Sequence, residues 1–158
     1  MKTSLPFTFL GSDAALEDAK FVVLPVPYDA TQTFRTGARF GPGAIISASI
    51  YAETDESYGR GIAPLVYTTA QLEVSKASPE ATLKNVEEAI SEIFSWKKVP
   101  VMLGGEHSIT IGAVRAASKK FSEFCVLQID AHADLYDEFE GTRYSHACVM
   151  RRCRELCE

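Results

Sequence analysis

The 158-residue sequence lacks the features of several specialised protein classes. No apolar run is long enough to cross a bilayer, which argues against a membrane protein. The first seven residues include one lysine but no sustained apolar stretch, so we expect no signal peptide and a cytoplasmic location. Repeats, low-complexity tracts and long linkers are also missing, and we therefore expect residues 1–158 to form a single domain.

Basic residues are outnumbered by acidic ones. Sixteen lysines and arginines stand against 21 aspartates and glutamates, for a formal net charge of -5. A general nucleic-acid-binding protein needs a basic face to displace counterions from phosphates, so this composition argues against that class. Mild acidity is compatible with a cationic small-molecule partner.

What is present is typical of a soluble globular protein, with 46% hydrophobic and 23% charged residues. Short continuous apolar runs predict strands that are buried on both faces. These runs are Phe21–Val26, Val99–Leu103 and Phe124–Ile129, with a weaker candidate at Val66–Thr69.

Helical patterns alternate with these strands. Ser78 is the expected N-cap, and Pro79 the first turn, of a helix that extends to about Trp96. This alternation predicts an α/β fold of three layers, in which helices cover both faces of a mostly parallel sheet. The other expected helices are Ala44–Ser49, Ser108–Lys120 and Cys148–Glu158.

The last of these helices contains three of the four cysteines and a group of arginines. Cys153 and Cys157 are four residues apart and could hold a metal ion on one helix face. We favour the interpretation that they are small packed side chains, because no Cys-x-x-Cys pair or second ligand cluster accompanies them. In the absence of export, the thiols are expected to be reduced. Arg151, Arg152 and Arg154 are expected on a solvated face.

Two polar runs lie where expected strands end. Gly104–Ser108 follows one strand directly, and Asp130–Asp134 follows the next. Ligands bind beyond the carboxyl ends of parallel strands, and residues two apart in extended backbone project to the same side. The acidic and histidine side chains of the second run are therefore expected to meet the histidine of the first. The candidate ligands are His107, Asp130, His132 and Asp134.

Two imidazoles and two carboxylates are mixed nitrogen and oxygen ligands, which suit Mn, Fe(II), Zn or Co. Taken singly, each residue has an ordinary explanation, since a histidine beside a strand usually packs and an aspartate after a strand often caps a helix. Taken together they favour a metal site, because burying so many titratable groups without a counter-ion is expensive.

The two polar runs resemble the first two metal-binding signatures of the ureohydrolase family, which includes arginase, agmatinase and formimidoylglutamase. Pro25–Asp29, Gly37–Pro42 and Tyr144–Ala147 are more similar to the agmatinase branch than to arginase. The resemblance extends from about Phe21 to Arg152, in the family's order.

This resemblance implies an arginase-like fold with two Mn(II) ions in each complete site. His107 and Asp134 would bind one ion and His132 the other, while Asp130 would bridge both. Glu106 stands where the family more often has an aspartate, which is a tolerable change if this carboxylate acts on the ligands indirectly.

His146 matches a loop histidine that shuttles protons or positions substrate in the family, and is the implied catalytic residue. Tyr144 and Ser145 are candidate substrate-binding residues. The implied reaction is hydrolysis of a linear guanidine or amidine C–N bond by a metal-bridging hydroxide, with agmatine and water giving putrescine and urea. The implied setting is polyamine biosynthesis, with a small cationic guanidine as partner and a homo-oligomer when the site is complete.

Family members are considerably longer than this sequence. Their next signature, an Asp-x-Asp after a later strand, completes both metal spheres, and a later glutamate pairs with the guanidinium. We therefore expect this chain to be the N-terminal part of such a domain, incomplete relative to the family, with one metal ion or none. Little or no turnover is expected from it alone.

Two other functions stay open. One is a non-catalytic metal-binding or regulatory subunit of the same fold, which would associate with a full-length relative. The other is a nucleotide-binding doubly wound domain, since Arg35–Pro42 before a helix could cradle a phosphate. That loop lacks the Gly-x-Gly-x-x-Gly and P-loop patterns, and Asp130 and Asp134 would repel a phosphate.

Overall fold

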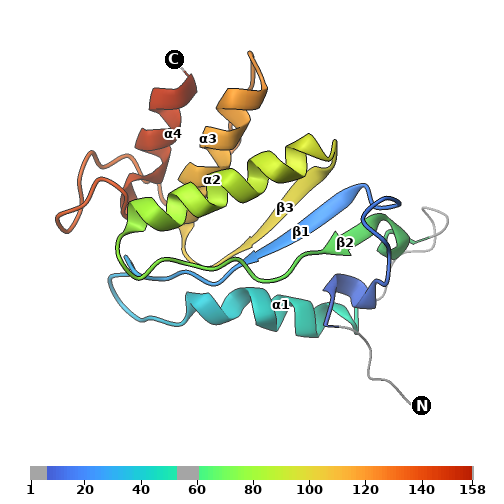
Figure 1. Cartoon of the computed structure of the whole chain (residues 1–158). Helices are drawn as coiled ribbons and strands as arrows, with labels where there is room; N and C mark the ends of the chain where they lie inside the picture. The colour runs from blue at the N-terminus through green and yellow to red at the C-terminus, as the bar shows by residue number, and fades with distance from the viewer. Residues whose placement is uncertain (1–6, 53–60, 158) are drawn as a thin grey trace.

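A parallel sheet forms the centre of the molecule in the computed structural model, which describes residues 7–52 and 61–157 (Figure 1). The central strand β1 (Phe21–Val26) pairs in parallel with β2 (Val66–Thr68) on one side and β3 (Val99–Gly104) on the other. The parallel sheet expected from the alternation of strands and helices is confirmed.

The central strand is buried because it has neighbours at both edges and helices over both faces. Residues 22–26 of β1 are all buried, as the continuous apolar run predicts. Its register places Phe21 opposite Val99 and Val26 opposite Gly104, so the carboxyl ends of β1 and β3 lie side by side. Polar residues that follow these two strands therefore meet at one edge of the sheet.

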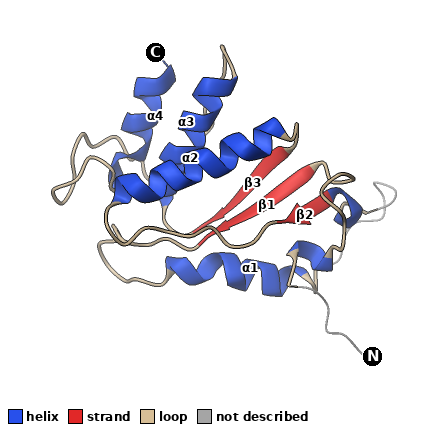
Figure 2. Ribbon diagram, viewed as in Figure 1, coloured by secondary structure: helices blue, strands red, loops and turns tan. Residues whose placement is uncertain are grey.

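Helices cover the sheet on both faces, and their bounds follow the predicted ones closely. Figures 1 and 2 show α1 against one face and α2 against the other, with α3 and α4 beyond α2. The helices are α1 (Gly41–Ser49), α2 (Pro79–Ser95), α3 (Thr110–Lys120) and α4 (Val149–Cys157).

Helix α2 shows why these predictions succeeded. The Ser78 hydroxyl accepts a hydrogen bond from the backbone N–H of Ala81 at 3.3 Å, which caps the helix as expected. Leu83, Val86 and Ile90 are almost completely buried, and they recur at helical spacing on the face that meets the sheet and α3.

Helices α3 and α4 each follow a single 3-10 turn that begins with a histidine. These turns are η5 (His107–Ile109) and η6 (His146–Cys148). The two expected helices are therefore present with slightly later starts, and Glu158 lies outside the described residues. Both histidines are held at a junction between a loop and a helix.

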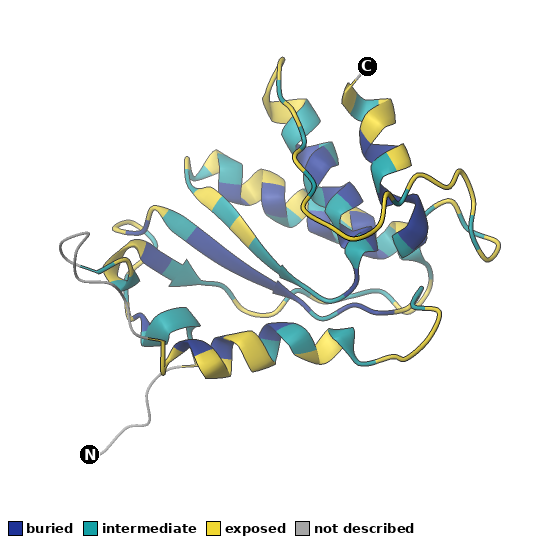
Figure 3. Ribbon diagram, turned by 180° about the vertical axis from the view of Figure 1, so that it is seen from behind, coloured by how far each residue is buried: buried dark blue, intermediate teal, exposed yellow. Residues whose placement is uncertain are grey.

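The strand predicted at Phe124–Ile129 is absent, because no strand of the described chain pairs with this segment. Phe124 and Val126 pack against the apolar cluster between α3 and α4, whereas Leu127 and Ile129 are 84% and 93% exposed. Figure 3 shows that much of the loop after α3 is exposed. An apolar run becomes a strand only where a neighbour satisfies its backbone N–H and C=O groups. The prediction of a buried strand at Phe124–Ile129 is therefore wrong in both pairing and burial.

Burial of β3 was also overpredicted. Val99 and Val101 are 45% and 37% exposed, because β3 has a hydrogen-bonded neighbour on only one edge within residues 7–52 and 61–157. Its alternate residues still pack beneath α2, so β3 has the half-buried pattern of an edge strand rather than that of a central one.

Arg152 contradicts the expectation of a solvated arginine face. It is only 5% exposed, and its Nη2 donates to Asp137 Oδ1 at 2.6 Å and to Glu155 Oε1 at 2.8 Å. Hydrogen bonds from Arg152 and then Arg143 lower the pKa of Asp137. Arg151 and Arg154 are exposed as predicted. Helix periodicity did not reveal that the loop before α4 covers one of the three side chains.

None of the helices in the described part of the chain combines the length and apolar character that crossing a bilayer requires. The single-domain organisation of residues 1–158 stays a prediction. Residues 1–6, on which the expectation about a signal peptide largely rests, lie outside the described residues.

Candidate metal centre and adjoining pocket

The end of β3 is held tightly against the segment that follows β1. The backbone N–H of Gly105 donates to Val26 O at 3.2 Å, and that of Glu106 donates to Tyr28 O at 2.7 Å. A Cβ added at Gly105 would overlap the Tyr28 carbonyl and lie 2.7 Å from the Tyr28 nitrogen. Only glycine allows this approach, so the Gly-Gly pair fixes where the following residues emerge.

His107 follows this turn and faces two carboxylates from another part of the chain. Its Nδ1 lies 2.6 Å from Asp134 Oδ2 and 3.5 Å from Asp130 Oδ2. One ligand atom from each residue lies within 4.8 Å of the other two. The structure therefore brings together three of the four predicted metal ligands.

The two aspartates are held by backbone contacts. The N–H of His132 donates to Asp130 Oδ1 at 2.9 Å, and this bond is the main reason that the pKa of Asp130 is lowered. Asp134 has a left-handed backbone with φ 47°, and its carbonyl accepts from the N–H of Met150 at 2.9 Å. The first turn of α4 thus anchors the residue whose carboxylate meets His107.

His132 does not join this group. Its side chain is 82% exposed, and its Nδ1 lies 3.7 Å from Asp130 Oδ1. The expectation that residues 130, 132 and 134 share one side required extended backbone, but the chain bends here and Asp134 is left-handed. The predicted metal role of His132 stays a prediction that this geometry does not support.

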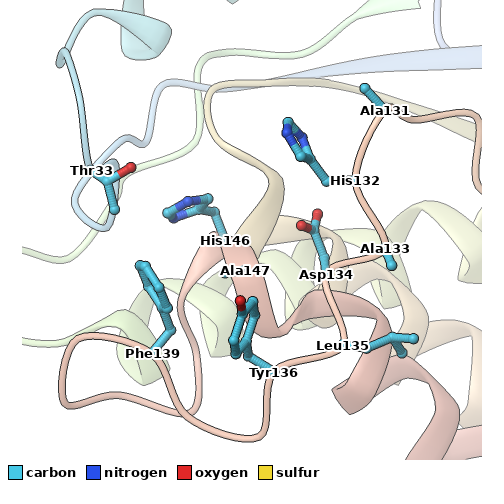
Figure 4. A pocket seen from close by; sticks show the side chains of 10 residues that line it. All are labelled: Thr33, Ala131, His132, Ala133, Asp134, Leu135, Tyr136, Phe139, His146 and Ala147. Carbon is cyan, nitrogen blue, oxygen red and sulfur yellow. The ribbon is translucent and has the colours of Figure 1, made fainter.

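An open pocket of about 820 Å³ adjoins the metal ligands at Asp134, the one of the three that lines it (Figure 4). His146 lies at the start of η6 and projects into it beside Phe139, with ring centroids 5.9 Å apart. The volume suits a small molecule. The lining residues are Thr33, Ala131, His132, Ala133, Asp134, Leu135, Tyr136, Phe139, His146 and Ala147.

Tyr144 and Ser145 lie away from this lining. Ser145 is buried and its hydroxyl accepts from the N–H of Ala147, which caps η6. The Tyr144 ring packs under the Arg115 guanidinium at 5.3 Å, on the side of α3. Their predicted role in substrate binding stays a prediction, while their observed contacts orient the turn that carries His146.

The segment after β1 is the other wall of the pocket. Asp29 is buried, and its Oδ2 accepts from the N–H of Gly37 at 2.8 Å while Oδ1 pairs with Arg39 Nη2 at 2.7 Å. Burial alone would raise the pKa of Asp29, but these bonds outweigh it and lower the pKa. The loop that contains Thr31 and Thr33 is thereby held near the metal ligands.

The sequence argument did not single out Thr31, Thr33 or Phe139. Thr33 and Phe139 line the pocket, and Thr31 contacts both Glu106 and His146. Thr31 and Thr33 lie between the two N-terminal stretches that carry the family resemblance, which was the available signal. Phe139 had none, because its place depends on how the loop folds.

Comparison with known proteins decides the affiliation. The family model described as the arginase family matches residues 19–157, which is most of the chain. The chain belongs to the arginase family. The resemblance inferred from the two metal signatures is confirmed, and the arginase-like three-layer fold agrees with solved structures.

Several arginase-family relatives resemble the chain over most of its length. N(1)-aminopropylagmatine ureohydrolase of Synechocystis sp. is 43% identical over 98% of this chain and 54% of its own length. Agmatinase of Pyrococcus horikoshii is 36% identical over 89% of this chain and 50% of its own. The crystal structure of agmatine ureohydrolase of Thermoplasma volcanium has a TM-score of 0.79 and 33% identity, covering 99% of this chain and 51% of that one.

The chain therefore spans about half the length of the curated arginase-family relatives that it matches. The comparison agrees with the expected correspondence to the N-terminal part of the family domain.

Proposed function

We propose that this chain carries one half of a metal-dependent ureohydrolase site that hydrolyses the guanidine C–N bond of agmatine or a close derivative. The observation that carries the proposal is the meeting of His107, Asp130 and Asp134 beside a pocket that also receives His146. Membership of the arginase family supports the reaction class.

The three ligands fit a divalent cation. One imidazole nitrogen and two carboxylate oxygens form a mixed donor set that suits Mn(II), and the ligand atoms already lie within reach of a single ion. A bound divalent cation supplies Lewis acidity and hydroxide near neutral pH. The chain's part is to hold His107 through the Gly-Gly turn and Asp134 through α4.

His146 is proposed to move the proton that the departing amine needs. A guanidinium carbon is a poor electrophile because its charge is spread over three nitrogens, and the reaction ends only when the amine leaves protonated. Within the pocket, Phe139 packs against the His146 ring and keeps one side of it away from water.

The substrate assignment rests on relatives and on charge. Two relatives are named for agmatine or its N(1)-aminopropyl derivative, which are linear guanidines. The carboxylates of Asp130 and Asp134 favour a cationic ligand at the end of the pocket where Asp134 lies. The relatives are twice as long, so we propose that turnover requires a second segment supplying further ligands and substrate contacts.

The metal half of the proposal is tested by titrating the 158-residue chain with Mn(II) and measuring affinity calorimetrically. We expect one ion per chain, at least tenfold weaker binding in His107→Asn, and less than threefold weakening in His132→Asn, the matched control. Equal losses in the two variants would contradict the ligand set drawn from the geometry.

The reaction is tested by measuring urea release from agmatine and from N(1)-aminopropylagmatine. We expect little urea from the 158-residue chain, and turnover when the C-terminal half of the Synechocystis relative is fused after residue 158. A folded, Mn(II)-loaded fusion that releases urea from neither compound would refute the substrate assignment. Metal binding by the short chain, with co-elution of a full-length relative, would favour the regulatory subunit.

A further inference from the structure

Glu106 is a buried carboxylate that the proposed chemistry leaves without a role. It is 4% exposed, and its two oxygens accept three hydrogen bonds. Thr31 N donates to Oε2 at 2.7 Å, the Thr31 hydroxyl donates to Oε1 at 2.5 Å, and the Ser108 hydroxyl donates to Oε1 at 2.6 Å. A buried carboxylate is tolerable only with such donors, so Glu106 holds Thr31 firmly.

Thr31 in turn holds His146. The Thr31 hydroxyl accepts from the backbone N–H of His146 at 3.0 Å, and the Thr31 carbonyl lies 2.7 Å from His146 Nδ1. A carbonyl oxygen can only accept, so Nδ1 must carry a proton. In the neutral ring, Nε2 is then the basic nitrogen that remains for the pocket that His146 lines.

We propose that Glu106 and Thr31 are positioning residues that fix both the orientation and the tautomer of His146. They connect the end of β3 to the loop after β1 and then to η6, across 75 and 115 residues of sequence. The hydroxyl of Thr31 is the central link, since it donates to Glu106 and accepts from His146. Only the consequence for proton transfer rests on the proposed function.

The tautomer is measured by long-range ¹H–¹⁵N NMR on the full 158-residue chain, which has only three histidines. His146 is assigned by the loss of its signals in His146→Asn. In the unsubstituted protein we expect protonation of His146 at Nδ1. Thr31→Val keeps the backbone carbonyl of residue 31 but removes the hydroxyl that ties Thr31 to Glu106 and to His146. We expect a smaller fraction of His146 protonated at Nδ1 and amide hydrogen exchange at His146 about tenfold faster.

Three further variants make the test specific. Thr31→Ser keeps the hydroxyl and should preserve the tautomer of His146. Glu106→Gln places an amide N–H donor against the N–H and O–H donors of Thr31, and should lose the fixed tautomer. Thr36→Val changes an exposed threonine of the same loop and should leave His146 unchanged.

Protonation of His146 at Nε2 in the unsubstituted protein would overturn the proposal. This measurement does not depend on whether any variant folds. So would a folded Thr31→Val protein with the original tautomer and exchange rate. Neither measurement involves substrate, so absence of urea from the fused chain would count against the proposed reaction and not against this positioning.

Discussion

Two loops supply the candidate ligands, and they are held very differently. Gly104–Ser108 follows the paired strand β3, and its Glu106 and Ser108 are buried with hydrogen-bond partners. Asp130–Asp134 follows a segment that pairs with no strand in the described chain, and the residues before Asp134 are exposed. The first loop is placed by the sheet, whereas the second is placed by the start of α4 and by contacts with His107.

The comparison teaches that a strand end positions side chains only when the strand has a neighbour. Gly105 and Glu106 bond to the chain that leaves β1, which locks His107 in place. The hydrogen bonds of His132 stay within its own segment, with Asp130 and Gln128, and its side chain is 82% exposed where it lines the open pocket. The effect of backbone pairing at the end of β3, and of its absence in residues 124–134, can each be tested.

The largest expected effect is at the rigid loop. Gly105→Ala forces a methyl group into the Tyr28 backbone, and we expect the free energy of unfolding to fall by about 4 kcal/mol or more. Gly43→Ala, within α1, is the matched control, since the Cβ added there meets only the Phe7 ring, at 4.0 Å. It should gain up to about 1 kcal/mol. Urea unfolding measures both, and a similar effect of the two substitutions would remove the contrast.

The next effect contrasts an apolar residue of the paired sheet with one of the unpaired segment. Val26→Thr keeps the side-chain shape but buries a hydroxyl, and should cost about 2–3 kcal/mol. Ile129→Thr alters a residue that is 93% exposed and should change stability by less than about 0.5 kcal/mol. A large cost at Ile129 in urea unfolding would mean that the segment is packed in solution.

Features that depend on residues close together in the sequence could be predicted from it. The cap at Ser78 and the spacing of Leu83, Val86 and Ile90 are local, and they located α2 within a residue. The apolar run of β1 was sufficient because neighbours exist on both sides of it. The fold class could therefore be predicted from the sequence, and so could a ligand set of which three of four members cluster in the structure.

The rest depended on contacts between distant parts of the chain. Phe124–Ile129 has the composition of a strand, but a strand also needs a partner that no local pattern reports. The high exposure of the His132 side chain follows from the missing strand partner. Glu106 and Thr31 are 75 residues apart, so their contact left no trace in spacing.

A third prediction contrasts two thiols. Cys153 is buried between α3 and α4, and burial raises its pKa to about 11, whereas Cys125 is exposed on the unpaired segment. Since the folded pKa lies above the ordinary value of 9.0, the neutral thiol's contribution is complete below about pH 9 and disappears as the pH rises through about 11.

We expect about 2 kcal/mol of stability to be lost over that interval through Cys153, measured as the difference in alkaline slope between the parent chain and Cys153→Ala. Equal slopes would contradict the buried thiol. At neutral pH, an alkylating reagent should modify Cys125 and spare Cys153.

The smallest effect concerns the hydrogen bond beneath the rigid loop. Ser108→Ala removes one of the three donors to Glu106 and should cost about 1 kcal/mol. Ser122→Ala, on the exposed turn that precedes the unpaired segment, should be neutral. Thermal unfolding of the pair measures the difference, and an equal response would show that Glu106 does not depend on Ser108.

The buried Arg152 has a consequence for how the pocket can move. Its guanidinium joins Asp137, in the loop before η6, to Glu155 in α4. Swinging that loop outward would break the 2.6 Å contact between Arg152 and Asp137 and uncover the guanidinium, whose bond to Glu155 stays within α4. An incoming guest must therefore match the existing wall or carry the C-terminal helix with it, so the loop and helix behave as one mechanical unit.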